Sequence, residues 1–586
     1  MKNIEISNIF ENIATLLQVR GEPSFRFRSY EKAARIISDL TVEASELIES
    51  GKFQDIQGIG KTIEEKTREI LDTGTCKAYE KLIDEMGVGV LELLDIQGIG
   101  PKTANRLYTE YEIRNIDQLA NALEDGTLKQ IKGLGKKTLV TIGESLEFLS
   151  ATRGSRIISM SIAFAEKISE ILKNCSAIHR FDITGDLRRK EEECHGIQFV
   201  IDCSSDIENT KEVLIKALQD YGFQVSNDLP SNQENNEKST LIQNVETIHF
   251  YIDNDFPVMI YLSSTENYEA TLFITTPSNE HLEALPLDNL TDSYAESSRY
   301  LEETKNHNET DIFEKLGMSF IPPELRQYSD TVSLAIDDNL PTLLEFDDMR
   351  GDLHSHTEWS DGRNTMNEMV ATAIKIGLEY FAITDHSVSS TVANGLDEER
   401  LLQQIEHVQK KDSVTEGIKL LAGSEVDIRR DGSLDYSDEV LAKLDIVVAS
   451  VHSHFNISEA DMTKRMISAI ENPFVNIIGH PTGRLLGRRP MYPINIDEIL
   501  AAAAEHNKIM EINGSPSRLD LGPEYVRKGK ELGILFSINT DAHSIPQFER
   551  REYGVNVARR SGLTKDDVIN TYTIERLVET LKHTRK

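Results

Sequence analysis

Hydrophobic positions divide the chain into three stretches with different periodicities. Over residues 1–150 the apolar residues recur at helical spacing and glycines interrupt them, which predicts a set of short helices. Residues 151–345 alternate helical runs, such as 156–174, with strand-like runs, such as 196–202. Residues 346–586 alternate strand-like runs with helical stretches throughout, which predicts parallel strands covered by helices and closed as a barrel. The pattern therefore predicts a multidomain α/β protein.

The strand-like runs of the last stretch are short and rich in branched and aromatic residues. They are residues 380–384, 418–423, 444–450, 474–480, 508–513 and 535–541. The middle stretch contains two polar segments. We expect residues 226–240 to form a loop and residues 284–310 to form loops and short helices.

Three similar units repeat within the first stretch. Each has an apolar residue, two spacers, a Gly-apolar-Gly turn and a helix with a basic first turn; the glycines are Gly58, Gly60, Gly98, Gly100, Gly133 and Gly135. Glycine allows positive φ and close backbone approach, and a helix start offers free N–H groups to a phosphate. The units resemble the helix-hairpin-helix, which holds the DNA backbone without reading sequence. The alternative is that they are only tight turns within a helical bundle.

The net charge of −35 is unusual for a protein that binds nucleic acid. It is unevenly distributed, with −6 in residues 1–150, −21 in residues 151–350 and −8 in the remainder. Affinity for DNA rests largely on Lys and Arg. The middle stretch is therefore a poor candidate for gripping DNA.

Composition indicates a soluble globular protein, with 39% hydrophobic and 27% charged residues. We expect no membrane partner, because no apolar run reaches the roughly 18 residues of a membrane span and no charged-then-apolar leader opens the chain. Four cysteines without CxxC spacing favour a reducing compartment and no disulfide framework. These features predict a cytoplasmic location.

Histidines and acids recur at the ends of the strand-like runs of the last stretch. They occur in GDLHSHTEWSDG (351–362), ITDHS (383–387), AGSEVDI (422–428), ASVHS (449–453), IIGHP (477–481) and NTDAH (539–543). Imidazoles and carboxylates gathered in this way are what a cluster of divalent metals requires. Any single histidine is as readily explained as a core or surface residue, but the joint pattern is not.

These motifs resemble the PHP (polymerase and histidinol phosphatase) domain, a distorted (β/α)7 barrel that holds up to three divalent ions. The resemblance covers residues 350–575 and implies nine ligands, which would also be the catalytic residues: His354, His356, Asp361, His386, Glu425, His452, His480, Asp541 and His543. Glu425 would be the bridging carboxylate. The chemistry expected is phosphodiester hydrolysis by a metal-bound hydroxide. Mixed ligands suit Mn, Zn or Fe, and the resemblance favours Mn.

Three arginines follow the ligand His480 in the segment HPTGRLLGRRP. Arginine binds phosphate oxygens through two parallel hydrogen bonds. We expect Arg484, Arg488 and Arg489 to steer the nucleic-acid backbone towards the metals. The alternative is an ordinary solvated cluster or ion pairs with neighbouring acids.

The whole chain resembles the bacterial family X DNA polymerases with a C-terminal PHP domain. Residues 311–326 are similar to the end of that family's polymerase core, and residues 20–37 to its small domain that grips the 5′ end at gaps. By this resemblance Arg26 and Tyr30 would contact the 5′-phosphate, and Lys66 falls where some relatives carry a Schiff-base lysine. The other lysines expected to contact the DNA backbone are Lys61, Lys102, Lys136 and Lys137.

The polymerase signature of that family is altered in the middle stretch. The family's Gly-Ser-x-Arg-Arg motif is here GDLRR (185–189), with Asp186 in place of the serine. The three metal-binding aspartates are replaced by Gly196, Gln198 and Met259. Nucleotidyl transfer needs carboxylates to hold two Mg²⁺ ions against the triphosphate and the primer end. We therefore predict a nucleotidyltransferase-like α+β domain that has lost polymerase activity.

These interpretations combine into a three-domain repair protein. Residues 1–150 would bind DNA, residues 151–345 would form the degenerate polymerase-like domain, and residues 346–586 would hydrolyse phosphodiesters. The predicted function is a metal-dependent 3′→5′ exonuclease on gapped or 3′-ended duplex DNA, acting as a monomer. The alternatives are an active gap-filling DNA polymerase, a small-molecule phosphatase resembling histidinol phosphatase, and a non-enzymatic DNA-binding scaffold.

Overall fold

The structure is a computed structural model of the chain, and it divides into two compact units, one mainly of residues 1–152 and one mainly of residues 153–586. It describes the whole chain except residues 1–2, 39, 41, 57, 88, 95, 97, 132, 152–153, 204–205, 227–244, 253–254, 288–303 and 586. Most of the polar segments predicted at residues 226–240 and 284–310 thus lies outside the described residues.

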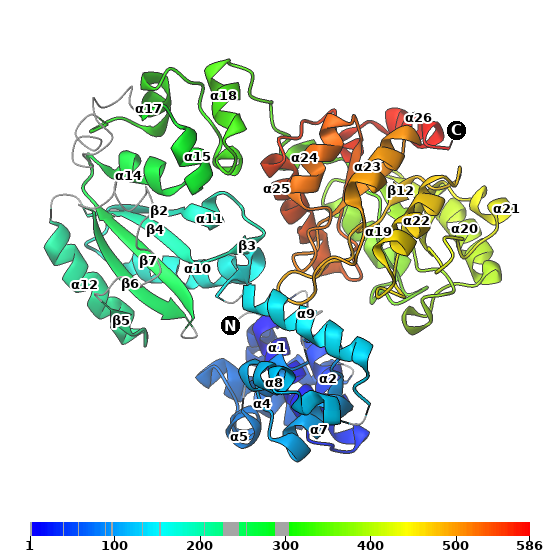
Figure 1. Cartoon of the computed structure of the whole chain (residues 1–586), viewed down its shortest axis with the longest axis horizontal. Coiled ribbons are helices and arrows are strands. Elements are labelled where there is room, and N and C mark those ends of the chain that lie inside the picture. The colour runs from blue at the N-terminus through cyan, green and yellow to red at the C-terminus, as the bar shows by residue number, and fades with distance from the viewer. Residues whose placement is uncertain are drawn as a thin grey trace. The chain divides into compact units, whose positions relative to one another are not determined.

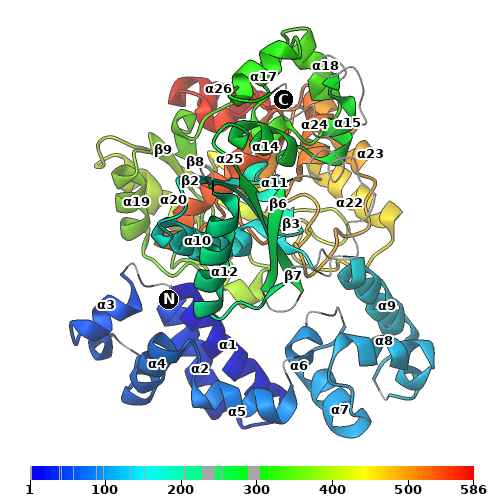
Figure 2. The same cartoon turned by 90° about the vertical axis from the view of Figure 1, so that its left-hand side faces the viewer.

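The first unit is helical, as the sequence predicts. Its helices are α1 (Asn3–Val19), α2 (Ser24–Ser38), α3 (Ala44–Glu49), α4 (Lys61–Thr73), α5 (Lys77–Met86), α6 (Gly89–Glu92), α7 (Pro101–Tyr111), α8 (Ile116–Glu124) and α9 (Lys136–Ala151). In Figure 2, α1–α5 form one group and α6–α9 a second. A core of branched aliphatic side chains, including Ile13, Ile70 and Leu107, runs through the unit.

The three predicted Gly-x-Gly turns precede α4, α7 and α9. The first glycine of each turn has a positive φ: +107° at Gly58, +91° at Gly98 and +100° at Gly133. This conformation costs most residues steric strain and glycine none, which explains the residue type. The second glycine of each turn is exposed and faces open space, so that another molecule can approach the backbone there.

The middle part of the second unit contains a mixed five-stranded sheet. Its strands run in the order β2 (Arg180–Thr184), β4 (Ile197–Asp202), β7 (Phe256–Ser263), β6 (Glu246–Ile252) and β5 (Val225–Ser226), with only β4 and β7 parallel. Two short strands, β1 (Arg156–Ile157) and β3 (Glu193–Cys194), pair separately. The sheet confirms the predicted α+β character of this stretch.

Helices lie on both sides of this sheet (Figure 1). They are α10 (Ile158–Asn174), α11 (Gly185–Arg188), α12 (Ile207–Asp220), α14 (Tyr268–Thr275), α15 (Asn279–Ala284), α17 (Glu309–Lys315) and α18 (Asp330–Ile336). The last four surround a core that includes Phe273 and Phe313. Arg326 is fully buried against Phe313 and pairs with Glu309 at 2.5 Å, and Glu309 also pairs with Arg188 of α11 at 2.6 Å. This buried network ties the helical part to the sheet.

The last part of the second unit is a parallel barrel of seven strands in sequential order. They are β8 (Gly351–Asp352), β9 (Tyr380–Ile383), β10 (Lys419–Asp427), β11 (Ile446–Ser450), β12 (Ile477–Ile478), β13 (Ile509–Asn513) and β14 (Phe536–Asn539). The residues after β8 and β14 meet through a bridge between Ser355 and Ala542, which nearly closes the barrel. This confirms the predicted seven-stranded α/β barrel.

Helices α19 to α24 of the barrel connect consecutive strands, as parallel pairing requires, and α25 and α26 follow the last strand. The helices and their bounds are α19 (Met366–Lys375), α20 (Glu398–Asp412), α21 (Asp438–Leu441), α22 (Glu459–Ile470), α23 (Ile496–Glu505), α24 (Pro523–Glu531), α25 (Arg551–Arg560) and α26 (Ile574–His583). Every residue of the strands except Lys419 is buried, which accounts for their near-continuous apolar runs.

Two further expectations concern disulfides and membrane spans. The four cysteines are buried and unpaired, as their spacing predicts. Among the helices of the described residues, none has the length and apolar character needed to cross a bilayer.

Candidate metal centre

The barrel strands deliver all nine predicted ligands to one place. His354 and His356 follow β8, His386 follows β9 and Glu425 lies within β10. The remaining residues are Asp361 further along the loop after β8, His452 after β11, His480 after β12, and Asp541 and His543 after β14. Parallel strands end at the same mouth of a barrel, so these side chains converge, and such mouths are where barrel active sites are built.

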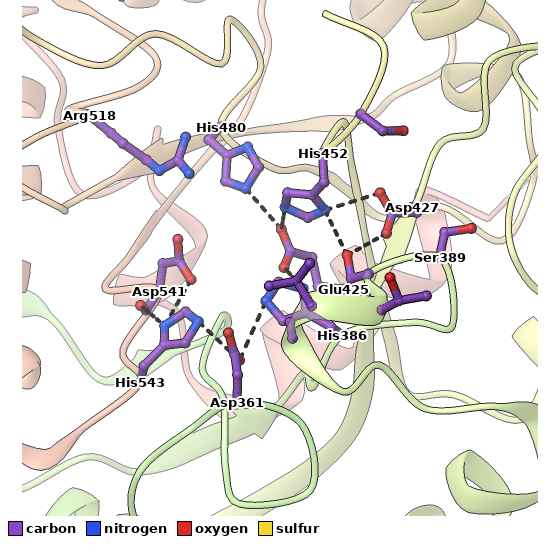
Figure 3. Close-up of a pocket in the computed structure, with 15 residues that line it drawn as sticks. Asp361, His386, Ser389, Glu425, Asp427, His452, His480, Arg518, Asp541 and His543 are labelled. Atoms are coloured by element: carbon purple, nitrogen blue, oxygen red, sulfur yellow. Dashed lines mark hydrogen bonds and ion pairs between the residues drawn. The ribbon is translucent and has the colours of Figure 1, made fainter. Parts of the chain in front are cut away.

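Glu425 lies at the centre of the cluster (Figure 3). Its Oε1 is 2.9 Å from Nε2 of His480 and 3.2 Å from Nε2 of His452. Its Oε2 is 2.8 Å from Nδ1 of His386, and His354 and His356 approach the same oxygen at 3.5 and 3.6 Å. The two carboxylate oxygens therefore face two different sets of imidazoles, which is the arrangement expected of a bridging ligand.

The two other acids complete the cluster. Asp541 Oδ1 is 3.1 Å from Nε2 of His356, and Asp361 Oδ1 is 3.3 Å from Nε2 of His543 and 3.6 Å from Nε2 of His386. Three sets of donor atoms are close enough to share an ion: His356, Asp361, His386 and His543; His354, His356 and Asp541; and His386, Glu425 and His452. The donor set is thus compatible with several divalent ions.

Buried donor atoms provide a test of whether metals fit. Nε2 of His354, both ring nitrogens of His356, Nδ1 of His386 and Oε2 of Glu425 are buried without a hydrogen-bond partner. Such groups cost free energy when they are left unsatisfied. Imidazole nitrogens and carboxylate oxygens are ligands for Zn²⁺ and related ions, so bound metals would satisfy one nitrogen of each ring and the oxygen of Glu425.

Electrostatics favours cations at this place. Burial raises the pKa of Glu425, but His452, His354 and His386 outweigh this effect and hold its pKa well below the usual value. Burial and the neighbouring His543 and His386 lower the pKa of His356 to about 3. Glu425 is therefore ionised and His356 neutral at pH 7, as metal ligation requires.

Two carboxylates outside the predicted set of nine ligands orient the ligand side chains. Glu511 of β13 accepts a hydrogen bond from Nδ1 of His354 at 2.7 Å and from the backbone N–H of His480 at 2.7 Å. Asp427, two residues after Glu425 on β10, is 3.1 Å from Nδ1 of His452. Each carboxylate directs the opposite ring nitrogen into the cluster. The alternation along β10 could have identified Asp427, but only the tertiary structure identifies Glu511.

The carboxylate of Asp385 organises the loop between two ligands. It accepts hydrogen bonds from the N–H and hydroxyl of Thr357 at 2.8 and 2.7 Å, from the hydroxyl of Ser360 at 2.5 Å and from Gln404 at 2.6 Å. These bonds fix residues 357–360, which connect His356 to Asp361.

A cavity of about 510 Å³ opens onto the cluster. Its lining includes Asp361, His386, Glu425, Asp427, His452, His480, Asp541 and His543, the loop residues 389–393, and Arg518. Arg518 is the one arginine or lysine among the described residues of this lining, and Figure 3 shows it beside His480 and Asp541. It is therefore placed to meet a phosphate. No sequence pattern indicates this arginine, because it lies in a loop without a motif.

For Arg484 the structure shows the alternative given for these arginines, contacts with neighbouring groups of the protein, including an acid. The Nε of Arg484 donates to the carbonyl of Arg518 at 2.9 Å, and its Nη2 is 2.5 Å from Oε1 of Glu192. Only 17% of the side chain is exposed. Its guanidinium is engaged within the protein rather than presented to DNA. Arg488, further along the segment, is exposed.

The predicted DNA contacts of the first unit lie on its surface. Lys61 and Lys136 begin α4 and α9, Lys102 is the second residue of α7 and Lys137 follows Lys136. All four are exposed. Arg26 is exposed beside Glu22 at 2.9 Å. Tyr30 is half-buried and stacks on Phe10, and Lys66 is half-buried on α4. The structure leaves their DNA contacts as predictions.

Family models match the helical unit and the barrel. Residues 1–76 match a helix-hairpin-helix domain, residues 90–147 a SAM-like helix-hairpin-helix tandem, and residues 352–515 the PHP domain. The fold and the metal-ligand motifs thus define a protein with DNA-binding helical units and a PHP barrel.

Relatives define the family more closely. The chain is 32% identical to the DNA polymerase/3′-5′ exonuclease PolX of Bacillus subtilis (strain 168), over 99% of this chain and 100% of that protein. It therefore belongs to the PolX family, the bacterial family X DNA polymerases with a C-terminal PHP domain. A probable phosphatase of Thermoanaerobacter sp. (strain X514) is 35% identical over 40% of this chain and 95% of its own length. Another, of Acetivibrio thermocellus, is 28% identical over 40% and 96%.

Metal addition gives a first prediction for this centre. We expect Mn²⁺ to raise the thermal unfolding midpoint of the protein relative to EDTA, because an ion bound only by the folded state adds about 2.7 kcal/mol of stability at 100 times its Kd. The measurement is differential scanning fluorimetry of the wild type and His354→Ala. A shift of equal size in both would show that the ion acts elsewhere.

Proposed function

We propose that the protein is a metal-dependent 3′→5′ exonuclease on DNA ends, with its chemistry in the barrel domain (residues 346–586) and its DNA affinity in residues 1–150. The observation that carries this proposal is the convergence of nine ligand-type side chains with buried, unpartnered donor atoms at the barrel mouth. The PolX relative, whose name includes 3′-5′ exonuclease activity, supports it.

The ligands we propose are His354, His356, Asp361, His386, Glu425, His452, His480, Asp541 and His543, holding up to three ions, Mn²⁺ foremost. When bound, such ions lower the pKa of a coordinated water and offset the charge of a phosphate. The protein contributes orientation, because Glu511 and Asp427 fix the rings of His354 and His452. Arg518 contributes a positive charge and hydrogen-bond donors for the scissile phosphate.

The helix-hairpin-helix regions indicate DNA binding. We propose that the exposed Gly-x-Gly turns and the lysines at the starts of α4, α7 and α9 contact the phosphate backbone. Helix N-termini bind anions through free N–H groups and the helix dipole. Contacts of this kind carry no sequence information, which suits an enzyme that acts on DNA ends.

We further propose that the middle domain (residues 151–345) has lost polymerase activity. Gln198 and Met259 lie opposite each other on the parallel strands β4 and β7, and neither can hold a metal. Met259 is 5% exposed and packs with Val200, Tyr261 and Leu272 in an apolar cluster. A side chain at Gly196 would place its Cβ 2.8 Å from the carbonyl oxygen of Pro257. The positions of the three family aspartates are thus neutral, and two of them are closely packed.

Side chains of the middle domain also occupy the region where the family motif would meet a nucleotide. Arg189 pairs with Asp186 at 2.7 Å and donates to the carbonyl of Thr276 at 2.6 Å. Gln198 lies against Gly185, with its Oε1 2.6 Å from the position of a Cβ there. Asp186 therefore neutralises an arginine that the family motif offers, and an incoming triphosphate would have to displace it.

Two nearby acids do not replace the missing carboxylates. Asp202 is fully buried and accepts a hydrogen bond from Thr265 at 2.8 Å. Asp206 caps α12 by accepting from the N–H of Asn209 at 3.0 Å. Both side chains already have structural partners away from positions 198 and 259.

Two other functions, a gap-filling polymerase and a small-molecule phosphatase, make different demands on the chain. A gap-filling polymerase would need the metals that positions 196, 198 and 259 cannot hold. A small-molecule phosphatase is suggested by relatives that match only 40% of the chain. A small-molecule phosphatase would not need the helix-hairpin-helix regions to bind its substrate.

One assay separates the three functions. Wild type and His354→Ala are incubated with a gapped duplex whose primer strand carries a 5′ label, in Mn²⁺, with and without dNTPs. We expect wild type to shorten the labelled strand with or without dNTPs, and His354→Ala to leave it intact. Extension by wild type would support the polymerase, and turnover of p-nitrophenyl phosphate without any DNA cleavage would support the phosphatase.

A further inference from the structure

Residues 191–195 connect the polymerase-like sheet to the barrel domain. The segment leads into β4, which carries Gln198. Oε1 of Glu192 is 2.5 Å from Nη2 of Arg484, and Glu191 pairs with Arg560. The side chains of Glu192 and Arg484 are only 14% and 17% exposed. At this burial an ion pair is screened less by solvent than a surface pair.

Arg484 in turn holds two loops at the barrel mouth. Its guanidinium donates to the carbonyls of Arg518 (2.9 Å) and Leu519. Asp520 in the same loop accepts hydrogen bonds from the backbone N–H groups of Thr482 (3.0 Å) and Gly483 (2.9 Å). The loop that begins at His480 and the loop that carries Arg518 are therefore tied together around one guanidinium.

A nearby glycine shows that the second loop is built around this side chain. A Cβ at Gly522 would lie 2.7 Å from Nη1 of Arg484. Any larger residue at position 522 would push the guanidinium away from the carbonyls that it holds.

Both loops contain residues in an unfavourable backbone conformation. His480 has φ +26° and Leu519 has φ +42°. A non-glycine residue in this region costs on the order of 1–3 kcal/mol and persists only where the surroundings enforce it. The hydrogen bonds around Arg484 supply that enforcement. What they hold in place is His480, 2.9 Å from Glu425, and the pocket-lining Arg518.

We propose that Glu192 is a positioning residue for the metal centre. Acting through Arg484, it fixes the two loops that present His480 and Arg518, so that the polymerase-like domain contributes to hydrolysis although it holds no metal itself. This inference rests on the proposed function in so far as that function places metals at the cluster.

The test compares two ion pairs that join the same two domains. Glu324 pairs with Arg559 at 2.8 Å, and the two side chains are 13% and 16% exposed, close to the values for Glu192 and Arg484. Glu324 and Arg559 contact neither of the two loops in the described structure. Glu324→Gln is therefore a matched control for Glu192→Gln, since both remove one charge from a similarly buried pair.

Mn²⁺ affinity, measured by isothermal titration calorimetry on the full chain, is the main readout. We expect Glu192→Gln to weaken binding by about 10- to 100-fold, the range found when a group that orients a metal ligand is removed. Glu324→Gln should stay within about twofold of wild type. Cleavage of a small phosphodiester, bis-p-nitrophenyl phosphate, should fall in kcat for Glu192→Gln alone, because this substrate needs no DNA-binding domain.

Arg484→Lys provides a second variant should Glu192→Gln fail to fold. It retains the positive charge and removes the planar group that reaches both carbonyls, and the same loss of affinity is expected. Adding Glu192→Gln to Arg484→Lys should cause little further loss, because residues in one network are not additive.

The outcomes separate this inference from the proposed function. Equal Mn²⁺ affinity in Glu192→Gln and Glu324→Gln, whether lowered or not, would overturn the positioning role and leave the proposed function standing. Absence of Mn²⁺ binding by wild type would overturn both.

Discussion

We expect Glu425→Gln to lose at least about a thousandfold of the rate of DNA cleavage in Mn²⁺, a loss of the order seen when a group that acts directly on reacting charge is removed. Glu425 lies within 3.6 Å of five imidazole rings, and glutamine keeps its shape while removing its charge. Single-turnover cleavage of a labelled 3′-ended duplex measures the rate, and calorimetry measures the remaining Mn²⁺ affinity.

Asp427→Asn should reduce the rate of DNA cleavage less than Glu425→Gln does. Asp427 contacts the proposed ligand His452 at Nδ1, on the side away from Glu425, so it orients this imidazole without belonging to the proposed ligand set. We expect a loss of about 10- to 100-fold. Circular dichroism in EDTA verifies that both variants are folded. If Glu425→Gln cleaved DNA at the wild-type rate, the barrel mouth would not be the active site.

The second large effect concerns the middle domain. We expect Met259→Asp, which returns a carboxylate to the position of a family aspartate, to destabilise the protein by about 3 kcal/mol or more instead of restoring polymerisation. The reason is that a charge would replace a buried side chain inside an apolar cluster. Thermal unfolding measures the loss, and primer extension with Mg²⁺ and dNTPs should show no incorporation.

Met259→Leu is the control, because it keeps the volume and apolar character of the side chain and should cost less than about 1.5 kcal/mol. If Met259→Asp were as stable as Met259→Leu and extended a primer, the domain would be a polymerase lacking one ligand rather than a repurposed scaffold.

Much of the candidate metal centre could be predicted from the sequence because each proposed ligand belongs to a short motif at the end of an apolar run. In a parallel barrel, such ends meet at one mouth. His354, Glu425 and Asp541 are far apart in the chain, yet this rule alone brings them together. Six of the seven strands were predictable for the same reason, since buried parallel strands are continuously apolar. Strand β8 is only Gly351–Asp352 and has no such run.

The partners of these ligands could not be predicted so well. Glu511 looks like any acid within a strand, and its contact with His354 spans 157 positions of sequence. The contacts of Arg484 were equally unpredictable, because its position next to a proposed ligand does not reveal which groups its side chain contacts. Its partner Glu192 is 292 positions away and lies in another part of the fold.

The sequence of the altered polymerase motif shows that carboxylates are missing. It does not show that side chains of the protein itself occupy the place of the family's site. The sequence shows Asp186, Gln198 and Met259 in place of family residues. Only the structure shows that Asp186 pairs with Arg189 and that Gln198 lies against Gly185. Side-chain rotamers in a mixed sheet depend on neighbours from several strands, which local patterns do not encode.

Crystals soaked with Mn²⁺ and a non-hydrolysable dNTP would show where the protein holds its metal, because anomalous scattering locates the ion independently of any activity. We expect anomalous peaks among His356, Glu425 and His452, and none beside Gln198 and Met259. A barrel mouth without peaks, or a metal-bound triphosphate against β4 and β7, would contradict this expectation.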